Sequence, residues 1–222
     1  MELKGKVINF LGDSITEGYG ISIEDRYDNI IKQKCDLADV YNYGISGTRI
    51  AHQRNASREP RYDLCFCGRA FDLNPDADIF VVYGGVNDYI HGDAPIGTPE
   101  DMTPATFCGG VNFLMNLLKT RYPGKTIVFM TPAHMNSGSE IDTEPSRQPE
   151  KRADAKPLAY YVEIIKAAGV KYGIPVLDLF ENLGIDPKIP VDRETYTVDG
   201  LHFNAAGHRA LADCLVAFLR SL

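Results

Sequence analysis

The chain has 222 residues, which fits one domain over residues 1–222, and its 44% hydrophobic and 24% charged composition is ordinary for a globular protein. Its net charge of −7, without clustered lysine and arginine, argues against nucleic acid and anionic membranes as partners. No run could span a bilayer, and the apolar run 7–11, interrupted by Asn9, is too short for a signal-peptide core. Five cysteines without a disulfide-framework spacing favour reduced thiols and a cytoplasmic location.

Short apolar runs alternate with helical patterns along the chain. The runs, rich in valine and isoleucine, predict buried strands at residues 6–11, 40–43, 78–83, 126–130 and 175–179. Helical patterns lie at about 24–38, 104–121, 155–172 and 204–221. The second helix carries one apolar stripe formed by Phe107, Val111, Leu114, Met115 and Leu118. This alternation predicts an α/β fold, a three-layer α/β/α sandwich around a five-stranded parallel sheet.

The segment at about 133–157 is polar and charged and shows no apolar periodicity. Connections of this length are uncommon in compact domains and are either functional or mobile. A solvated loop and a lid over a functional site are both consistent with this segment.

Four clusters of glycine and polar residues follow the predicted strands or precede the last helix. They are Gly-Asp-Ser at 12–14, Gly-Ile-Ser-Gly at 44–47, Gly-Gly-Val-Asn-Asp at 84–88 and Asp-Gly-Leu-His at 199–202. Each cluster alone is a common turn or helix-cap pattern. Ligands of parallel sheets bind outside the carboxyl ends of the strands, so the four together predict a site at that edge.

The first cluster suggests how a nucleophile could be exposed. Gly12 permits a tight turn, which would place Ser14 at the start of the next segment with its hydroxyl and its N–H facing the same crevice. Ser46 is a rival nucleophile because it also follows a strand beside glycine. No serine lies in a Gly-x-Ser-x-Gly elbow, so an ordinary α/β-hydrolase arrangement is not supported, and Ser14 is preferred.

With these four blocks in this order, the chain resembles the SGNH, or GDSL-type, hydrolase family over nearly its whole length. The resemblance implies a flavodoxin-like sandwich and a serine esterase. Ser14 would be the nucleophile, His202 the general base, and Asp199 the group that orients the imidazole. The oxyanion hole would comprise the N–H groups of Ser14 and Gly47 and the side-chain amide of Asn87. The reaction would transfer an acyl group to Ser14 and then to water, with no cofactor and no metal.

The substrate class is less constrained than the reaction. A small soluble ester or an acetylated carbohydrate is favoured, because no broad apolar helix is evident. Alternatives are a lysophospholipase or thioesterase acting on lipid-like acyl chains, and a non-catalytic carbohydrate-binding protein on the same fold. A phosphate binder is disfavoured because residues 12–20 contain no lysine or arginine.

The remaining polar residues have structural interpretations. We expect Asp13 and Asp88 to brace loops, Gly44 to permit a bend, and residues 89–93 to overhang the site, either shaping its pocket or only connecting elements. His208 should lie at the surface or cap a helix.

Metal binding is disfavoured. His52, His91 and His134 lack a metal-binding spacing, and Cys65-Phe66-Cys67 is tighter than a Cys-x-x-Cys pair and has no second half.

Overall fold

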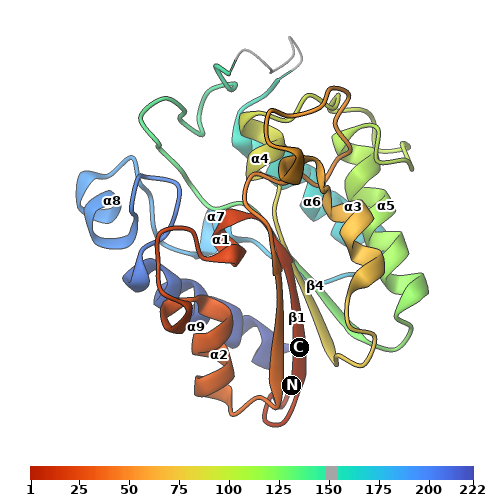
Figure 1. Cartoon of the computed structure of the whole chain (residues 1–222), viewed down its shortest axis with the longest axis vertical. Coiled ribbons are helices and arrows are strands. Elements are labelled where there is room, and N and C mark those ends of the chain that lie inside the picture. The colour runs from red at the N-terminus through yellow and green to blue at the C-terminus, as the bar shows by residue number, and fades with distance from the viewer. Residues whose placement is uncertain (149–154) are drawn as a thin grey trace.

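A computed structural model describes residues 1–148 and 155–222, and within them five strands form one parallel sheet of order β2-β1-β3-β4-β5 (Figure 1). The strands are β1 (Val7–Gly12), β2 (Asp39–Gly44), β3 (Ile79–Tyr83), β4 (Thr126–Met130) and β5 (Val176–Leu177). This order is the flavodoxin-like one, and helices cover both faces of the sheet. The predicted three-layer α/β/α sandwich is therefore confirmed.

The helices differ widely in length. The longer ones are α2 (Tyr27–Cys35), α5 (Phe107–Arg121), α6 (Leu158–Tyr172) and α9 (Ala205–Ser221). The short ones are α1 (Ser14–Glu17), α3 (Phe66–Arg69), α4 (Val86–Ile90), α7 (Leu179–Asn182) and α8 (Pro190–Tyr196). The 3₁₀ turns in the described part of the chain are η1 (Ile23–Asp25), η2 (Pro60–Asp63) and η3 (Ala70–Asp72). Among residues 1–148 and 155–222, no helix is long and apolar enough to cross a membrane.

The sheet separates two apolar cores. Figure 1 shows α2 and α9 on one face and α3, α5 and α6 on the other. Side chains alternate along β3, so Ile79, Val81 and Tyr83 enter the core under α2 and α9. Phe80 and Val82 enter the core under α5 and α6. Burial on both faces explains why the strands appear in the sequence as continuous apolar runs.

The apolar stripe predicted for the second helix is buried in α5. Every member of the stripe is at most 1% exposed: Phe107, Val111, Leu114, Met115 and Leu118. The helix begins three residues later than predicted because the Thr106 side chain caps it, accepting a hydrogen bond from the N–H of Gly109 at 3.0 Å.

Other predicted boundaries were wrong where a local backbone feature ends an element. The helix expected at 24–38 is divided into η1 and α2, and Asp36, in the left-handed region with φ 52°, ends α2. The helix α6 begins after Pro157. The fifth strand is only two residues long because Asp178 caps α7 directly after it. Residues 190–196 form a helix that the sequence did not indicate, since no side chain of α8 is buried to create a periodic signal.

Part of the long polar segment can be located. Residues 149–154 of the predicted 133–157 loop or lid lie outside the described residues. Residues 137–140 contribute side chains beside the carboxyl end of the sheet, and Asp142, whose carboxylate binds Lys188, holds the segment near α7 and α8.

Candidate active site

The turn between β1 and α1 places Ser14 at the carboxyl end of the sheet. Gly12 ends β1, and a Cβ atom there would lie 2.0 Å from Thr16 Oγ1, so a larger residue does not fit. Asp13 caps α1 by accepting a hydrogen bond from the N–H of Ile15 at 3.1 Å. Ser14 is the first residue of the helix, where backbone N–H groups have no partner within the helix itself. The Gly-Asp-Ser sequence therefore presents both groups of Ser14 together.

A chain of hydrogen bonds joins Ser14 to the segment before α9. His202 Nε2 lies 2.9 Å from Ser14 Oγ, and His202 Nδ1 lies 2.7 Å from Asp199 Oδ2. Asp199 Oδ1 also accepts hydrogen bonds from the N–H groups of Leu201 at 2.9 Å and of His202 at 2.8 Å. Ser14 thus forms one continuous serine–histidine–aspartate arrangement with His202, which lies 188 positions later in the sequence, and with Asp199.

The ionisation of Asp199 defines the proton positions in this arrangement. Partial burial raises the pKa of Asp199, but the hydrogen bonds from the imidazole and from two backbone N–H groups outweigh it and lower the pKa to about 2. Asp199 is therefore a carboxylate at neutral pH and can only accept. An acceptor at Nδ1 keeps the proton of neutral His202 on that nitrogen, which leaves Nε2 able to take a proton from the serine hydroxyl.

Gly47 and Asn87 approach the same place from the ends of β2 and β3. Gly47 has φ 75°, and a Cβ atom on it would lie 2.4 Å from Cδ1 of Tyr62. The Asn87 amide donates from Nδ2 to the Thr48 carbonyl at 3.1 Å, and its Oδ1 lies 3.0 Å from His91 Nε2. Nδ2 carries two hydrogens, so a second donor remains for a ligand beside Ser14.

These groups share one open pocket with a volume of about 320 Å³, lined by Ser14, Gly47, Asn87 and His202. Most of the other lining residues carry a polar group, and together they are Tyr19, Ser46, Tyr62, Ile90, His91, Ser137, Ser139, Glu140, Gln148 and Leu201. The ring of Tyr19 packs on His202, with 4.4 Å between ring centroids. Both the segment after Asn87 and the polar segment 133–148 therefore supply walls of the pocket.

Ser46 lies in this pocket with different partners. Its hydroxyl and its N–H both donate to the carboxylate of Glu17, which also accepts a hydrogen bond from Arg61 at 2.6 Å. Ser14, by contrast, has an imidazole within hydrogen-bond distance. The geometry therefore favours Ser14 over Ser46 as the nucleophile.

The aspartates beside the site brace loops, as predicted. Asp13 caps α1, and the Asp88 carboxylate accepts hydrogen bonds from the N–H groups of Ile50 at 2.8 Å and Ala51 at 3.0 Å. Gly44 is needed for close packing, because its Cβ would lie 2.2 Å from the backbone nitrogen of Glu17. The close approach of β2 and α1 at Gly44 is therefore a reason for glycine at this position in addition to the predicted bend.

The prediction that His208 could lie at the surface was wrong. The residue is 1% exposed, and its Nδ1 accepts a hydrogen bond from the N–H of Tyr27, the first residue of α2, at 3.3 Å. The alternative prediction, that His208 caps a helix, fits this contact, because its Nδ1 accepts from the first N–H of α2. The last helix thus packs against α2 through His208 and does not expose it to solvent.

Two arginines support the site, Arg49 buried and Arg69 partly buried, and sequence reasoning did not identify them. Arg49 donates to the Gly47 carbonyl at 3.2 Å. Arg69 donates to the Gly12 carbonyl at 3.0 Å and to Thr48 Oγ1 at 2.8 Å. Burial lowers the pKa of Arg69 to about 10, so the side chain remains a cation at neutral pH. The signal available for Arg49 was a charged residue two positions after the Gly44–Gly47 block and directly before the apolar Ile50.

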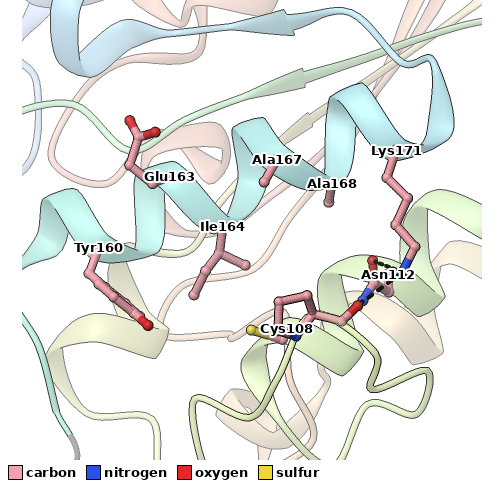
Figure 2. Close-up of a pocket in the computed structure, with 9 residues that line it drawn as sticks. Cys108, Asn112, Tyr160, Glu163, Ile164, Ala167, Ala168 and Lys171 are labelled. Carbon is pink, nitrogen blue, oxygen red and sulfur yellow. Dashed lines mark hydrogen bonds between the residues drawn. The ribbon is translucent and has the colours of Figure 1, made fainter.

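A second pocket, of about 270 Å³, lies away from Ser14 between α5 and α6 (Figure 2). Its floor is apolar, with Ile164 and Ala168 opposite Cys108, and Lys171 and Asn112 lie at one end. None of the residues that line this second pocket lines the pocket around Ser14. Across residues 1–148 and 155–222, no group of three or more histidine, cysteine, aspartate or glutamate side chains could hold a metal ion.

Comparison with known proteins identifies the family. The model of the GDSL-like lipase/acylhydrolase family matches residues 10–210. The chain therefore belongs to the GDSL-like lipase/acylhydrolase family, as its sequence blocks suggested, and it is a hydrolase that acts on ester bonds. No curated protein matches the chain.

Solved structures share the fold of this chain. A protein from Lactobacillus plantarum is 33% identical, with a TM-score of 0.84 over 99% of this chain and 98% of that one. A GDSL-like protein from Bacteroides ovatus is 19% identical, with a TM-score of 0.68 over all of both chains. A carbohydrate acetylesterase family member from Sinorhizobium meliloti is also 19% identical, with a TM-score of 0.64 over 97% of this chain and 98% of that one. At 19% identity the likeness is one of fold.

Proposed function

We propose that the protein is a serine esterase that forms an acyl-enzyme on Ser14. The observation that carries the proposal is the continuous arrangement from Ser14 Oγ through His202 to Asp199, with separations of 2.9 and 2.7 Å. A serine hydroxyl is a weak nucleophile until a neighbouring base takes its proton, and the base in turn needs an orienting group. His202 and the ionised Asp199 meet both needs.

The steps follow from the positions of these atoms. Ser14 Oγ attacks the ester carbonyl carbon while its proton passes to His202 Nε2. Negative charge develops on the carbonyl oxygen and is stabilised by the N–H groups of Ser14 and Gly47 and by Asn87 Nδ2. The protonated imidazole then gives its proton to the departing alcohol as the carbon–oxygen bond breaks. Water, deprotonated by the same nitrogen, releases the carboxylic acid from Ser14 and regenerates the enzyme.

The pocket lining supports a small acyl group on a hydroxyl-rich alcohol, such as an acetylated carbohydrate. Ser46, Ser137, Ser139 and Gln148 offer hydrogen-bonding groups, and the ring of Tyr19, 54% exposed, offers an apolar face at the rim. The carbohydrate acetylesterase family member from Sinorhizobium meliloti has the same fold. A lipid-like acyl chain would need a longer apolar channel than Ile90 and Leu201 provide.

Covalent labelling tests the reaction. A fluorophosphonate should label the protein at Ser14, and Ser14→Ala should abolish both labelling and hydrolysis of p-nitrophenyl acetate. The matched variant Ser46→Ala should keep the label. Full hydrolysis by Ser14→Ala, or a label mapped to Ser46, would exclude this mechanism. A wild-type protein that shows neither labelling nor hydrolysis would favour the non-catalytic binding protein.

A substrate panel tests the acyl and alcohol preference. We expect kcat/KM to fall as p-nitrophenyl esters lengthen from acetate to octanoate, and acetylated sugars to release acetate. A rise in kcat/KM with chain length would favour the lysophospholipase or thioesterase alternative.

The cysteines also bear on where the protein works. The five cysteines, none of them in a disulfide, agree with a reducing compartment, and we propose the cytoplasm.

A further inference from the structure

The Asn87 side chain can serve an oxyanion only in one of its two amide orientations. With Nδ2 toward the pocket it donates to developing negative charge, whereas the flipped amide would present an oxygen and repel that charge. Its Nδ2 donates to the Thr48 carbonyl at 3.1 Å, and its Oδ1 lies 3.0 Å from His91 Nε2. The contacts that hold the Asn87 amide in this orientation should therefore affect the rate of ester hydrolysis.

His91 is in turn held by Arg49. The Arg49 guanidinium lies 3.3 Å from His91 Nδ1 and can only donate, so Nδ1 must be the acceptor. A neutral imidazole that accepts at Nδ1 carries its hydrogen on Nε2, which then donates to Asn87 Oδ1. The direction of every bond in this chain follows from the arginine. An amide nitrogen turned toward His91 would place two donors against each other.

The position of Arg49 is itself well defined. The side chain is 3% exposed and donates to Ser57 Oγ at 2.8 Å, with the Asp63 carboxylate at 3.4 Å. The same guanidinium donates to the Gly47 carbonyl at 3.2 Å. One buried cation therefore contacts Gly47, which carries one of the three proposed oxyanion donors, and reaches a second donor, Asn87, through His91.

We propose that His91 is a positioning residue, which together with Arg49 holds the Asn87 amide with its nitrogen toward the substrate carbonyl. The inference rests on the proposed function, because it assigns a role within the same oxyanion hole. His91 acts through Asn87 and does not itself touch the reacting atoms. The specific consequence is that the effect of changing His91 depends on the presence of Asn87.

A double-mutant cycle with p-nitrophenyl acetate tests this dependence. His91→Phe keeps a ring beside Tyr62 but removes both nitrogens, and it should lower kcat by about tenfold, the typical effect of one lost hydrogen bond, with little change in KM. In the Asn87→Ala background the same change should have no further effect on kcat. His91→Gln keeps one donor and one acceptor, so it should recover kcat to within about threefold of the wild type.

The outcomes separate this inference from the proposed function. Loss of labelling and hydrolysis in Ser14→Ala confirms the nucleophile independently of His91. If His91→Phe lowers kcat equally with and without Asn87, or leaves kcat unchanged in the wild-type background, the positioning role is overturned while the nucleophile stands. An unchanged kcat in Asn87→Ala overturns it as well. Thermal unfolding monitors folding of each variant, and His91→Ala replaces His91→Phe in the cycle if the phenyl ring prevents folding.

Discussion

At the scale of single residues, Gly47 lies where a side chain has neither a favourable backbone conformation nor space. Its φ of 75° is in the left-handed region, which costs an L-residue roughly 1–2 kcal/mol. A Cβ atom would also meet the Tyr62 ring at 2.4 Å, well inside van der Waals contact. The ring therefore packs directly against the peptide whose N–H we propose as an oxyanion donor.

Gly47→Ala should therefore lower kcat by more than the strain of a left-handed backbone alone would cause. Tyr62 or the peptide must move, so we expect kcat for p-nitrophenyl acetate to fall by about 10²-fold, as for loss of one oxyanion donor. Gly124→Ala is the matched control, because Gly124 has φ 77° and a Cβ there meets nothing within 4 Å. It should cost about 1–2 kcal/mol in urea unfolding and leave kcat unchanged. Equal losses of kcat in the two variants would contradict this account.

The residues that we propose to react were easier to predict than the residues that hold them in place. Ser14 and His202 occur in short blocks whose order along the chain is informative. Arg69 donates to the carbonyl of Gly12, 57 residues away, and Arg49 donates to the carbonyl of Gly47, two residues before it, and every residue has such a carbonyl. No spacing rule therefore identifies these arginines in advance. His208 was misplaced for a related reason, since its partner is a backbone N–H 181 residues away.

At the scale of elements, parallel register explains why three of the four sequence blocks meet. Gly12 pairs with Gly44 on β2 and with Tyr83 on β3, so these strands end at one level of the sheet. The loops that follow must then emerge side by side. This much of the site was predictable from strand order alone. The wall formed by residues 137–148 was not predictable, because a segment without periodicity contains no signal for its direction.

That wall is attached to the rest of the protein through Asp142. Its carboxylate is fully buried and accepts hydrogen bonds from Lys188 Nζ at 2.8 and 2.9 Å, His134 Nδ1 at 2.6 Å and the Met135 N–H at 3.1 Å. Burial raises the pKa of Asp142, but these hydrogen bonds together lower it below its usual value. The carboxylate therefore stays charged and fixes the segment that carries Ser137 and Glu140.

Lys188→Met should loosen this wall while leaving the catalytic groups in place. Removing one partner of a buried carboxylate costs about 1–3 kcal/mol, and His134 remains as a second partner. We expect KM for an acetylated sugar to rise several-fold with kcat for p-nitrophenyl acetate within about twofold of the wild type. Lys166→Met is the control, because Lys166 also binds two carboxylates, Glu163 and Asp178, outside the pocket lining. A rise of KM in both variants, or in neither, would refute the link between Asp142 and the pocket.

At the scale of the whole molecule, two buried groups make stability depend on pH in opposite directions. Burial raises the pKa of Asp13 to about 6, so the folded protein resists its ionisation, and that contribution to stability is lost as pH rises from 3.8 through 6. Burial lowers the pKa of His208 to about 4 from 6.5, so the folded protein keeps it neutral. Its contribution is complete above pH 6.5 and is lost as pH falls toward 4.

Replacing His208 should therefore flatten the acid side of the stability curve. His208→Asn keeps an acceptor near the position of Nδ1 for the Tyr27 N–H but cannot take up a proton. Between pH 7 and pH 4, urea unfolding should show a smaller loss of unfolding free energy in the variant, by up to roughly 3 kcal/mol. Asp13 titrates in both proteins, so the difference between them isolates the histidine. His52→Asn, the same substitution at an exposed side chain, is the control, and an equal change in both variants would show that burial of His208 is not the cause.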